Sequence, residues 1–381
     1  MALDSPIYLD NNATTPVDSR VADLVTHYSI EEYGNAGSRT HGWGSTAAKV
    51  VQKAREQVAE PVGATPDEVV FTSGATESNN LAILGIRDYG NSSNKRHIIT
   101  TAIEHHAVLE PVEILTESGF EATILPASED GLVTAESLAA ALRPDTVLVS
   151  TMHANNETGV ELPIDDYAQV LEGHDAWWHV DAAQTFGKRN GGLSKPRIDM
   201  ISISGHKMFA PKGIGALVLR RRGYERPPLS PLMHGGGQER GLRPGTLPVA
   251  LIAGLGLASE LAQLEAKDRR QACEDFRQSA LAALRDLGCQ FNGDSSASLP
   301  HVANVSFPGI DAEAAIVVVK ELIAISNGSA CTSDSYEPSH VLTAMGLNQE
   351  RIAGALRFSW NHHTVEPDWD QVKARLSTII R

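Results

Sequence analysis

Cysteine, long apolar runs and export signals are scarce or missing in this sequence. Three of its 381 residues are cysteine and none forms a CxxC pair, so a disulfide framework is not indicated. No run of about 18 apolar residues is present, as a membrane-spanning helix would require. The first twenty residues also lack the basic and apolar regions of an export signal. We therefore expect a cytoplasmic protein with no membrane partner.

Acidic residues outnumber basic residues in this sequence. The chain has 32 Lys and Arg against 47 Asp and Glu, which gives a formal net charge of −15. Such a surface does not favour neutralisation of a phosphate backbone, so direct nucleic-acid binding is not expected. Histidine pairs at 105–106 and 362–363 lack the HExxH or cysteine–histidine spacing of metal sites. No metal is expected either.

The residues that are present predict an α/β protein. Hydrophobic residues make up 42% of the chain and charged residues 21%, which is typical of a globular protein. Between about 69 and 219, short β-rich runs alternate with segments of helical apolar spacing, which predicts a mostly parallel sheet covered by helices. The β-rich runs are VVFTSG, HIITTAIEH, TVLVSTMHANN, WWHVDAAQ, DMISISGHK and GALVLRR.

A change of pattern toward the carboxy terminus predicts a second, smaller domain. An Ala/Leu/Glu-rich stretch from about 247 to 287 indicates one or two linking helices, and the segments after it indicate an α+β layer that ends in an amphipathic helix. We expect a large domain over 15–255 and a small domain formed by 1–14 and 256–381.

Lys207 is the first candidate for chemistry. It ends a strand-like run in SISGHKMFAPKGIGAL and is followed by a glycine-rich turn. A lysine at a strand end is most often a solvated charge. Here Ser204 and His206 offer donors beside it, and an amine desolvated near positive charge can lose its proton and form a Schiff base with an aldehyde.

Asp181 and the segment FTSGATESNNLAIL provide two further signals. Asp181 closes an apolar strand in HVDAAQTFGK, where it is suited either to cap the next helix or to pair with the ring nitrogen of pyridoxal phosphate. In the other segment a strand, a glycine turn and a helix start carry Thr76. A helix start of this kind can bind a phosphate through its free N–H groups, although many such starts serve capping alone.

Ten ordered motifs resemble those of the NifS/IscS-type cysteine desulfurases, which are fold-type I pyridoxal-phosphate (PLP) enzymes. The resemblance spans about residues 7 to 360. It implies a large domain with a mostly parallel seven-stranded sheet between helices, plus a smaller α+β carboxy-terminal domain. The motifs are YLDNNATTP, GNAGSRTHGWG, FTSGATESNNLAI, EHHAVLEP, MHANNETGV, HVDAAQTFGK, SGHKMFAPKGIGAL, HGGGQERGLRPGT, SNGSACTSDSYEPSHVL and ALRFSW.

The resemblance implies a role for each residue of the cofactor site. Lys207 is expected to bind the PLP aldehyde, Asp181 the ring nitrogen and Gln184 the phenolic oxygen. His105 is expected to stack on the ring and to assist proton transfer. The remaining residues expected to hold the cofactor are Ala75, Thr76, Asn156, Ser204 and His206.

Substrate and subunit contacts follow from the same resemblance. Arg357, Asn156 and Asn35 are expected to bind the substrate carboxylate, a task suited to a bidentate guanidinium. Thr246 is expected to reach the phosphate of a neighbouring subunit, which implies a homodimer. Two departures from the common family pattern, GNAGS for GNPAS and RPGT for RSGT, lie beside Asn35 and Thr246, and neither removes a catalytic group.

Cys331 is the expected sulfur carrier. Glycine and serine surround it in SNGSACTS, which predicts a mobile loop able to approach the substrate and then to deliver a persulfide elsewhere. A free cysteine is more commonly a small buried hydrophobe, and we apply that interpretation to Cys273 and Cys289.

The predicted reaction converts L-cysteine to L-alanine and passes the sulfur from Cys331 to an acceptor protein. Iron–sulfur cluster assembly, tRNA thiolation and DNA phosphorothioation all remain open as destinations, and SNGSACTS resembles the desulfurase of the last system. Two rivals remain: a PLP lyase or aminotransferase acting on selenocysteine or another amino acid, and a non-catalytic sulfur-transfer scaffold.

Overall fold

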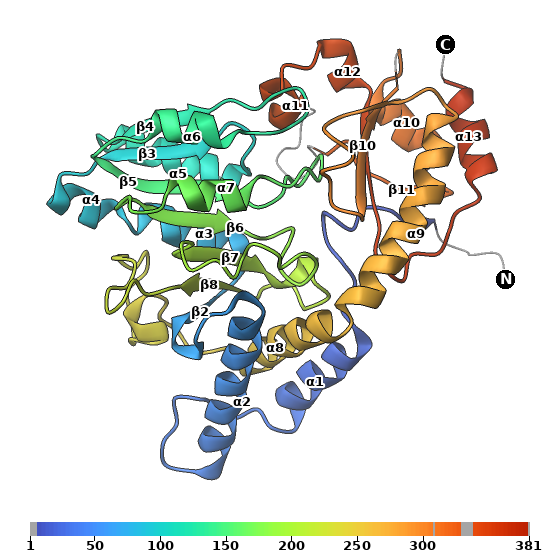
Figure 1. The fold of residues 1–381 in the computed structure, drawn as a ribbon. Coiled ribbons are helices and arrows are strands. Elements are labelled where there is room, and N and C mark those ends of the chain that lie inside the picture. Colours follow the sequence, from blue (N-terminus) through green and yellow to red (C-terminus); the bar gives the residue numbers. More distant parts are fainter. Residues whose placement is uncertain (1–5, 308, 329–337, 380–381) are drawn as a thin grey trace.

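The computed structural model describes residues 6–307, 309–328 and 338–379 of the chain (Figure 1). A seven-stranded sheet forms the centre of the larger part. Its order is β2-β8-β7-β6-β5-β3-β4, and only β8 runs antiparallel to its neighbours. This confirms the predicted mostly parallel sheet. The strands are β2 (Val69–Thr72), β3 (His97–Thr101), β4 (Glu121–Leu125), β5 (Thr146–Met152), β6 (Trp177–Asp181), β7 (Met200–Ser204) and β8 (Gly215–Leu219).

The central strands are apolar on both faces because helices cover both faces. Ile98 packs in one core with residues of α3 and α5, whereas its neighbour Ile99 packs in the other core, and Val70 and Phe71 divide in the same way. Alternate side chains of a strand point to opposite faces, so a doubly covered sheet needs continuous apolar runs. Helices α1 and α2 both pack against α8, and all three contribute to the core on the second face (Figure 1).

The helices of this larger part follow the predicted alternation with strands. They are α1 (Ser19–Ile30), α2 (Gly42–Ala59), α3 (Ala75–Leu84), α4 (Arg87–Ser93), α5 (His106–Glu117), α6 (Ala135–Ala141), α7 (Ile164–Val170) and α8 (Val249–Leu264), with 3₁₀ turns η1 (Glu60–Val62), η2 (Pro66–Glu68), η3 (Gly205–Lys207) and η4 (Glu239–Gly241).

The linking stretch forms two helices, α8 and α9 (Ala266–Arg285), which meet at a bend of 73°. Within the described part of the chain, no single helix has the length and apolar character needed to cross a bilayer; only this bent pair, taken together, meets those two criteria. Most of α8 packs in the core of the larger part, whereas α9 packs in a separate core.

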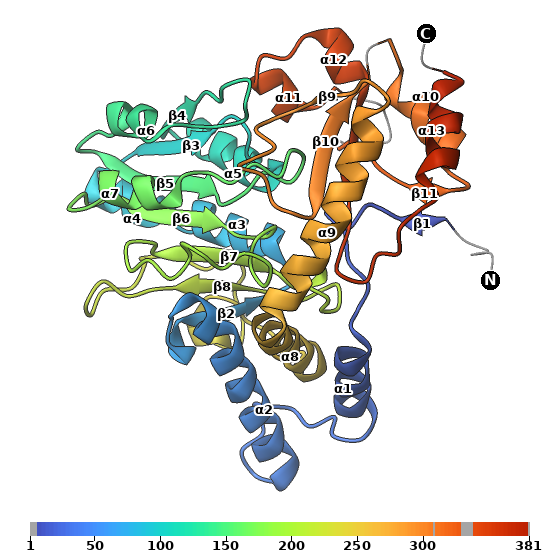
Figure 2. The same cartoon turned by 45° about the vertical axis from the view of Figure 1, so that its right-hand side comes forward.

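The smaller part combines a three-stranded antiparallel sheet, ordered β12-β10-β9, with helices around it (Figure 2). β1 pairs in parallel with β11, so the amino-terminal strand lies on the carboxy-terminal part of the chain. The predicted domain boundaries, with a large domain over 15–255 and a small domain from 1–14 and 256–381, stay a prediction. The elements are β1 (Ile7–Tyr8), β9 (Gln290–Phe291), β10 (Val302–Ser306), β11 (Ile323–Ala324), β12 (Ala355–Ser359), α10 (Ala312–Val319), α11 (His340–Ala344), α12 (Gln349–Ala353) and α13 (Trp369–Ser377).

Candidate active site

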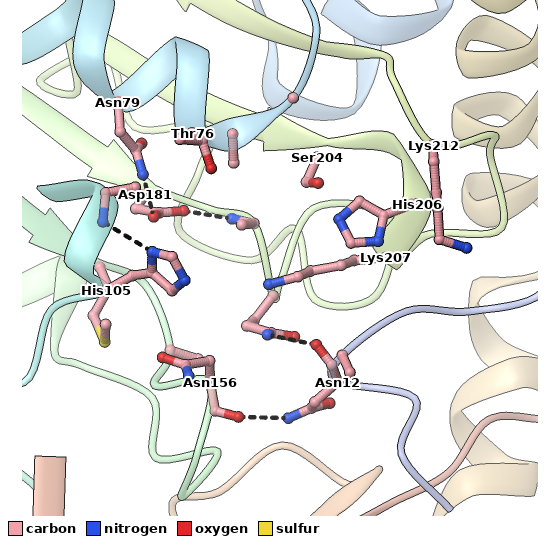
Figure 3. A pocket seen from close by; sticks show the side chains of 18 of the residues that line it. Asn12, Thr76, Asn79, His105, Asn156, Asp181, Ser204, His206, Lys207 and Lys212 are labelled. Carbon is pink, nitrogen blue, oxygen red and sulfur yellow. Dashed lines mark hydrogen bonds between the residues drawn. The ribbon is translucent and has the colours of Figure 1, made fainter. Parts of the chain in front are cut away.

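The carboxyl ends of the strands meet at one edge of the central sheet, and a cavity of about 450 Å³ lies there (Figure 3). Asp181 ends β6, Ser204 ends β7, and His105 and Asn156 follow β3 and β5. This is the edge at which open α/β sheets bind ligands. Of the residues predicted for the site, those lining the cavity are Ala75, Thr76, His105, Asn156, Asp181, Gln184, Ser204, His206, Lys207 and Arg357.

Lys207 is held by the turn that follows β7. The η3 turn carries it out of the sheet, and the backbone N–H groups of Met208 and Ala210 both bond to the Gly205 carbonyl. Thr15 fixes the same turn from the amino-terminal segment, because its N–H and hydroxyl groups donate to the His206 carbonyl. Figure 3 shows the Lys207 amine extended into the middle of the cavity.

Asp181 is buried at the floor of the cavity with both carboxylate oxygens bonded. Its Oδ1 accepts from the Ala183 N–H over 2.8 Å, and its Oδ2 accepts from Asn79 Nδ2 over 2.7 Å (Figure 3). Asn79 lies on α3, one turn after Thr76. Sequence analysis did not single it out, although the spacing of three residues places it on the same helix face as Thr76.

The start of α3 forms an anion cradle. Gly74 precedes the helix, and the side chain of Ser78 is tied to Thr72 by a 2.8 Å contact between their hydroxyl oxygens. A Cβ atom on Gly215 of β8 would lie 2.6 Å from Gly74 Cα, so glycine at that strand position is what allows the cradle to sit against the sheet. The backbone N–H groups of the first turn favour a negatively charged ligand.

His105 caps α5 and faces the cavity. Its Nδ1 accepts from the Ala107 N–H over 3.0 Å, which leaves the proton of the neutral ring on Nε2. Burial lowers the pKa of His105 to about 4, and the charge of Lys207 adds to that effect. Burial and Lys207 also lower the pKa of His206 to about 4. Both rings are therefore neutral near pH 7.

Arg357 enters the cavity from β12 and is almost fully buried. Its Nη2 donates to Asp10 Oδ1 over 2.8 Å and its Nη1 donates to the Asn156 carbonyl over 3.0 Å, whereas its Nε has no partner. A buried guanidinium with a donor still unused is suited to bind a carboxylate.

Two predicted residues lie elsewhere in the same chain. Asn35 and Thr246 line a separate hollow of about 390 Å³ together with Tyr28 and Tyr33. Neither residue lines the cavity that contains Lys207. Cys331, the predicted sulfur carrier, lies outside the described residues. Within the described part of the chain, no group of three or more His, Cys, Asp or Glu side chains is arranged to hold a metal ion.

The cavity contains buried polar atoms that lack a hydrogen-bond partner in the described part of the chain, and these fit the predicted cofactor. Five of the ten buried side-chain atoms that lack a hydrogen-bond partner among the described residues belong to residues that line it: Asn12, Asn79, Asn156, Gln184 and Arg357. Buried polar groups are normally paired, so this concentration indicates a polar ligand. Sheet topology and cavity together define the fold-type I PLP enzymes as the class of protein.

Comparison with known proteins gives the particular family. A model of the class-V aminotransferases matches residues 7–372. Cysteine desulfurase IscS from Dechloromonas aromatica is 46% identical over 97% of this chain and 91% of that protein. A NifS-like protein superposes with a TM-score of 0.88 at 38% identity, covering 98% of both chains, and DndA from Streptomyces lividans with 0.82 at 51%, covering 95% of this chain and 99% of that one. The chain therefore belongs to the class-V aminotransferase family, within its cysteine desulfurase branch.

Proposed function

We propose that the protein is a PLP-dependent cysteine desulfurase that converts L-cysteine to L-alanine and holds the sulfur as a persulfide on Cys331. The observation that carries this proposal is the meeting of Lys207, Asp181, His105 and Arg357 in one cavity at the carboxyl edge of the sheet. In the overall reaction the substrate C–S bond breaks, an S–S bond to Cys331 forms, and the substrate carbon retains the electron pair and gains a proton.

The chain's own residues would hold the cofactor by its two polar ends. Asp181 is placed to pair with the ring nitrogen, and the α3 cradle with Thr76, Ser204 and His206 to hold the phosphate. Gln184 and Asn156 have buried oxygens still unpaired toward the cavity. When bound, PLP supplies a ring that accepts electrons from the substrate carbon.

Substrate orientation and proton movement fall to three side chains. Arg357 binds the substrate carboxylate and so fixes which bond faces the cofactor. The Lys207 amine, which reaches the middle of the cavity, moves the proton at the substrate Cα (Figure 3). The neutral His105 lines the same space with its proton on Nε2, where it would contact the cofactor and assist proton transfer.

Cys331 is the candidate nucleophile because the other two cysteines are unreactive. Burial raises the pKa of Cys273 to about 11 and that of Cys289 to about 11, so both remain thiols near pH 7. The thiolate is the reactive form of cysteine. The interpretation as a buried small hydrophobe is confirmed for Cys273, which lies on the buried face of α9, whereas Cys289 is only partly buried.

The deciding experiment compares wild type with Cys331→Ser. Alanine and protein-bound persulfide are measured with L-cysteine while the PLP absorbance is followed, and Cys273→Ser serves as the matched control. We expect the first variant to lose persulfide and alanine formation while its PLP spectrum still responds to L-cysteine. Equal alanine formation in wild type and Cys331→Ser would favour the PLP lyase instead, and a spectrum with no response to L-cysteine would favour the scaffold.

We further propose that a homodimer completes each site. Thr246 and Asn35 lie away from the cavity of their own chain, and the surface near their hollow exposes large apolar side chains: Ile30, Tyr33 and Trp43 are 69%, 68% and 49% exposed. An exposed apolar patch of this kind is typical of an interface. Such a dimer would bring Thr246 to the phosphate of the partner cavity.

Subunit complementation tests this arrangement. Lys207→Ala and Thr246→Ala chains are refolded together, and PLP affinity and activity are compared with those of each variant alone. If Thr246 serves the partner, the mixed dimer contains one intact site and regains activity that neither variant shows. No gain on mixing would contradict a contact across subunits.

The destination of the sulfur stays open among the three predicted pathways. We propose transfer to an acceptor protein in the cytoplasm, without direct contact with nucleic acid, because the net charge of −15 disfavours a phosphate backbone. Incubating persulfidated enzyme with candidate acceptor proteins and following loss of the Cys331 persulfide by mass spectrometry distinguishes the pathways.

A further inference from the structure

Glu157 is a buried carboxylate that the proposed reaction does not use. It is 2% exposed and directly follows Asn156, which lines the cavity. The Asn155 side chain holds it in a tight turn, because Asn155 Oδ1 accepts from the N–H groups of both Glu157 and Thr158 over 2.8 and 2.9 Å. A buried carboxylate in a rigid turn is costly unless it has partners.

Residues on both sides of the Cys331 stretch lie against Glu157, and one of them is its hydrogen-bond partner. Ser339 Oγ donates to Glu157 Oε2 over 2.6 Å and itself accepts from the Leu342 N–H, so it also caps α11. On the other side, a Cβ atom built on Gly328 would lie 3.0 Å from the same Oε2 atom, and Gly328 has a φ of +85°. Residues 328 and 339, which lie on either side of 329–337, are therefore both beside this carboxylate.

Gly328 also connects back to Arg357, through Ser326. Gly328 N–H donates to Ser326 Oγ over 3.1 Å, and Ser326 exchanges backbone hydrogen bonds with Arg357. Arg357 in turn donates to the Asn156 carbonyl. The contacts form a closed path from Glu157 through Gly328, Ser326 and Arg357 to Asn156, which is the sequence neighbour of Glu157.

His340 adds a second attachment on the same side. Its Nε2 donates to the Glu104 carbonyl over 2.8 Å, and its ring centroid lies 4.4 Å from that of His106. Glu104 and His106 are the sequence neighbours of His105. The border at 339–340 is thus fixed to residues adjoining both Asn156 and His105.

We propose that Glu157 is a positioning residue that ties both borders of the Cys331 stretch to the residues that seat the substrate carboxylate. The inference rests on the proposed function, because it concerns the approach of Cys331 to a substrate held by Arg357. Burial raises the pKa of Glu157 and the Ser339 hydrogen bond opposes that rise, which agrees with a carboxyl group enclosed by these contacts.

The test separates sulfur transfer from substrate binding. Glu157→Ala and Ser339→Ala remove the shared contact, and Ser259→Ala, a buried serine that donates to the Gln57 carbonyl over 2.8 Å, is the matched control. Leaving a buried hydrogen-bonding group without its partner costs about 1–3 kcal/mol, and about 1.4 kcal/mol is already tenfold in an equilibrium or a rate. We expect Cys331 persulfide formation in a single turnover to fall at least about tenfold in the first two variants only.

Two further readouts and one conservative variant give results that a general loss of stability would not reproduce. L-alanine binding, followed by the PLP spectrum, needs Arg357 but no thiol, and its dissociation constant should change less than about threefold. Glu157→Gln keeps the volume and an acceptor oxygen, so it should retain transfer within about threefold. In the protein without PLP, hydrogen exchange at Gly328 and Leu342 should accelerate in Ser339→Ala, whereas exchange in β10 should not.

The outcomes distinguish the two proposals. If wild type forms no persulfide on Cys331, the proposed function fails and the positioning role fails with it. If wild type forms it and folded Ser339→Ala forms it equally fast, or loses L-alanine binding in parallel, only the positioning role is overturned. Ser339→Ala decides the matter should Glu157→Ala not fold.

Discussion

Asn79 and Asp181 are 102 positions apart in the sequence, yet Asn79 Nδ2 donates a 2.7 Å hydrogen bond to Asp181 Oδ2. The bond joins the helix that we propose to hold the cofactor phosphate to the strand end that we propose to hold the ring nitrogen. One contact between α3 and β6 therefore links the two proposed ends of the cofactor site.

Asn79→Ala tests this contact. The Asp181 carboxylate would lose a buried donor, and a hydrogen bond to a charged group is worth roughly 1.5–3 kcal/mol. We expect PLP affinity, measured by equilibrium dialysis, to fall at least about tenfold. Asn80→Ala is the control, because Asn80 is on the same helix but donates to the Thr76 carbonyl. Equal losses in the two variants would show that the helix, and not the contact, was disturbed.

Gly215→Ala tests the cradle. The added Cβ would lie 2.6 Å from Gly74 Cα and 2.4 Å from the Ile203 carbonyl oxygen, so β8 and the cradle must move apart. We expect weaker PLP binding, together with a loss of stability of roughly 1–3 kcal/mol from overpacking. A Cβ on Gly42, at the start of α2, meets nothing within 4 Å, so Gly42→Ala should leave both properties nearly unchanged. Unaltered PLP affinity in Gly215→Ala would contradict the cradle's dependence on this close approach.

Lys188 predicts a pH dependence of stability. Burial lowers the pKa of its amine to about 7, with Lys207 adding to the effect, and its Nζ lies 3.3 Å from His301 Nε2. An unfolded lysine has a pKa of about 10.4. Between these values the unfolded chain binds more protons than the folded one, so the Lys188 contribution to stability rises with pH across this window and is least favourable below about pH 7.

Lys188→Met removes this penalty. We expect its Tm to exceed that of wild type by roughly 2 °C or more at pH 6.5, and by less at pH 10. Lys195→Met is the control, because Lys195 is half-exposed and pairs with Asp165 at the surface. A difference in Tm that stays the same at both pH values would disprove the lowered pKa.

Glu239 predicts a large loss of stability on substitution. Its carboxylate is fully buried, accepts from both Nη atoms of Arg55 and also accepts from the Phe71 N–H over 2.7 Å. Removing one partner of a buried ion pair leaves an uncompensated charge, which costs about 3–5 kcal/mol. We expect Glu239→Ala to lower the free energy of unfolding in urea by that amount.

A surface pair provides the comparison for Glu239. Arg221 pairs with Asp67 where both side chains are a third or more exposed, so Asp67→Ala should cost about 1 kcal/mol or less. Similar losses for the two substitutions would show that burial does not govern the Arg55–Glu239 contact.

Much of the fold was predictable because its signals are local. The six predicted runs that became β2, β3, β5, β6, β7 and β8 are continuous, since both faces of the sheet are covered there, and the turn after Ser204 is marked by the glycines and prolines around Lys207. The edge strand β4 was not among the predicted runs, because its sequence EATIL is only partly buried and has no continuous apolar run. The run from His97 forms a strand only as far as Thr101. The family motifs supplied the site residues because each motif is a single turn or strand end.

By itself, then, the sequence determined most of the strand and helix order, the family and most of the residues that line the cavity, all of which depend on short segments. Only the tertiary structure decided which distant groups meet. Asn79 reaches Asp181 because β2 and β6 end at one edge of the sheet, and Ser339 reaches Glu157 because the smaller part packs against that edge. Such contacts depend on the packing of elements far apart in the chain, and no local pattern encodes their distances.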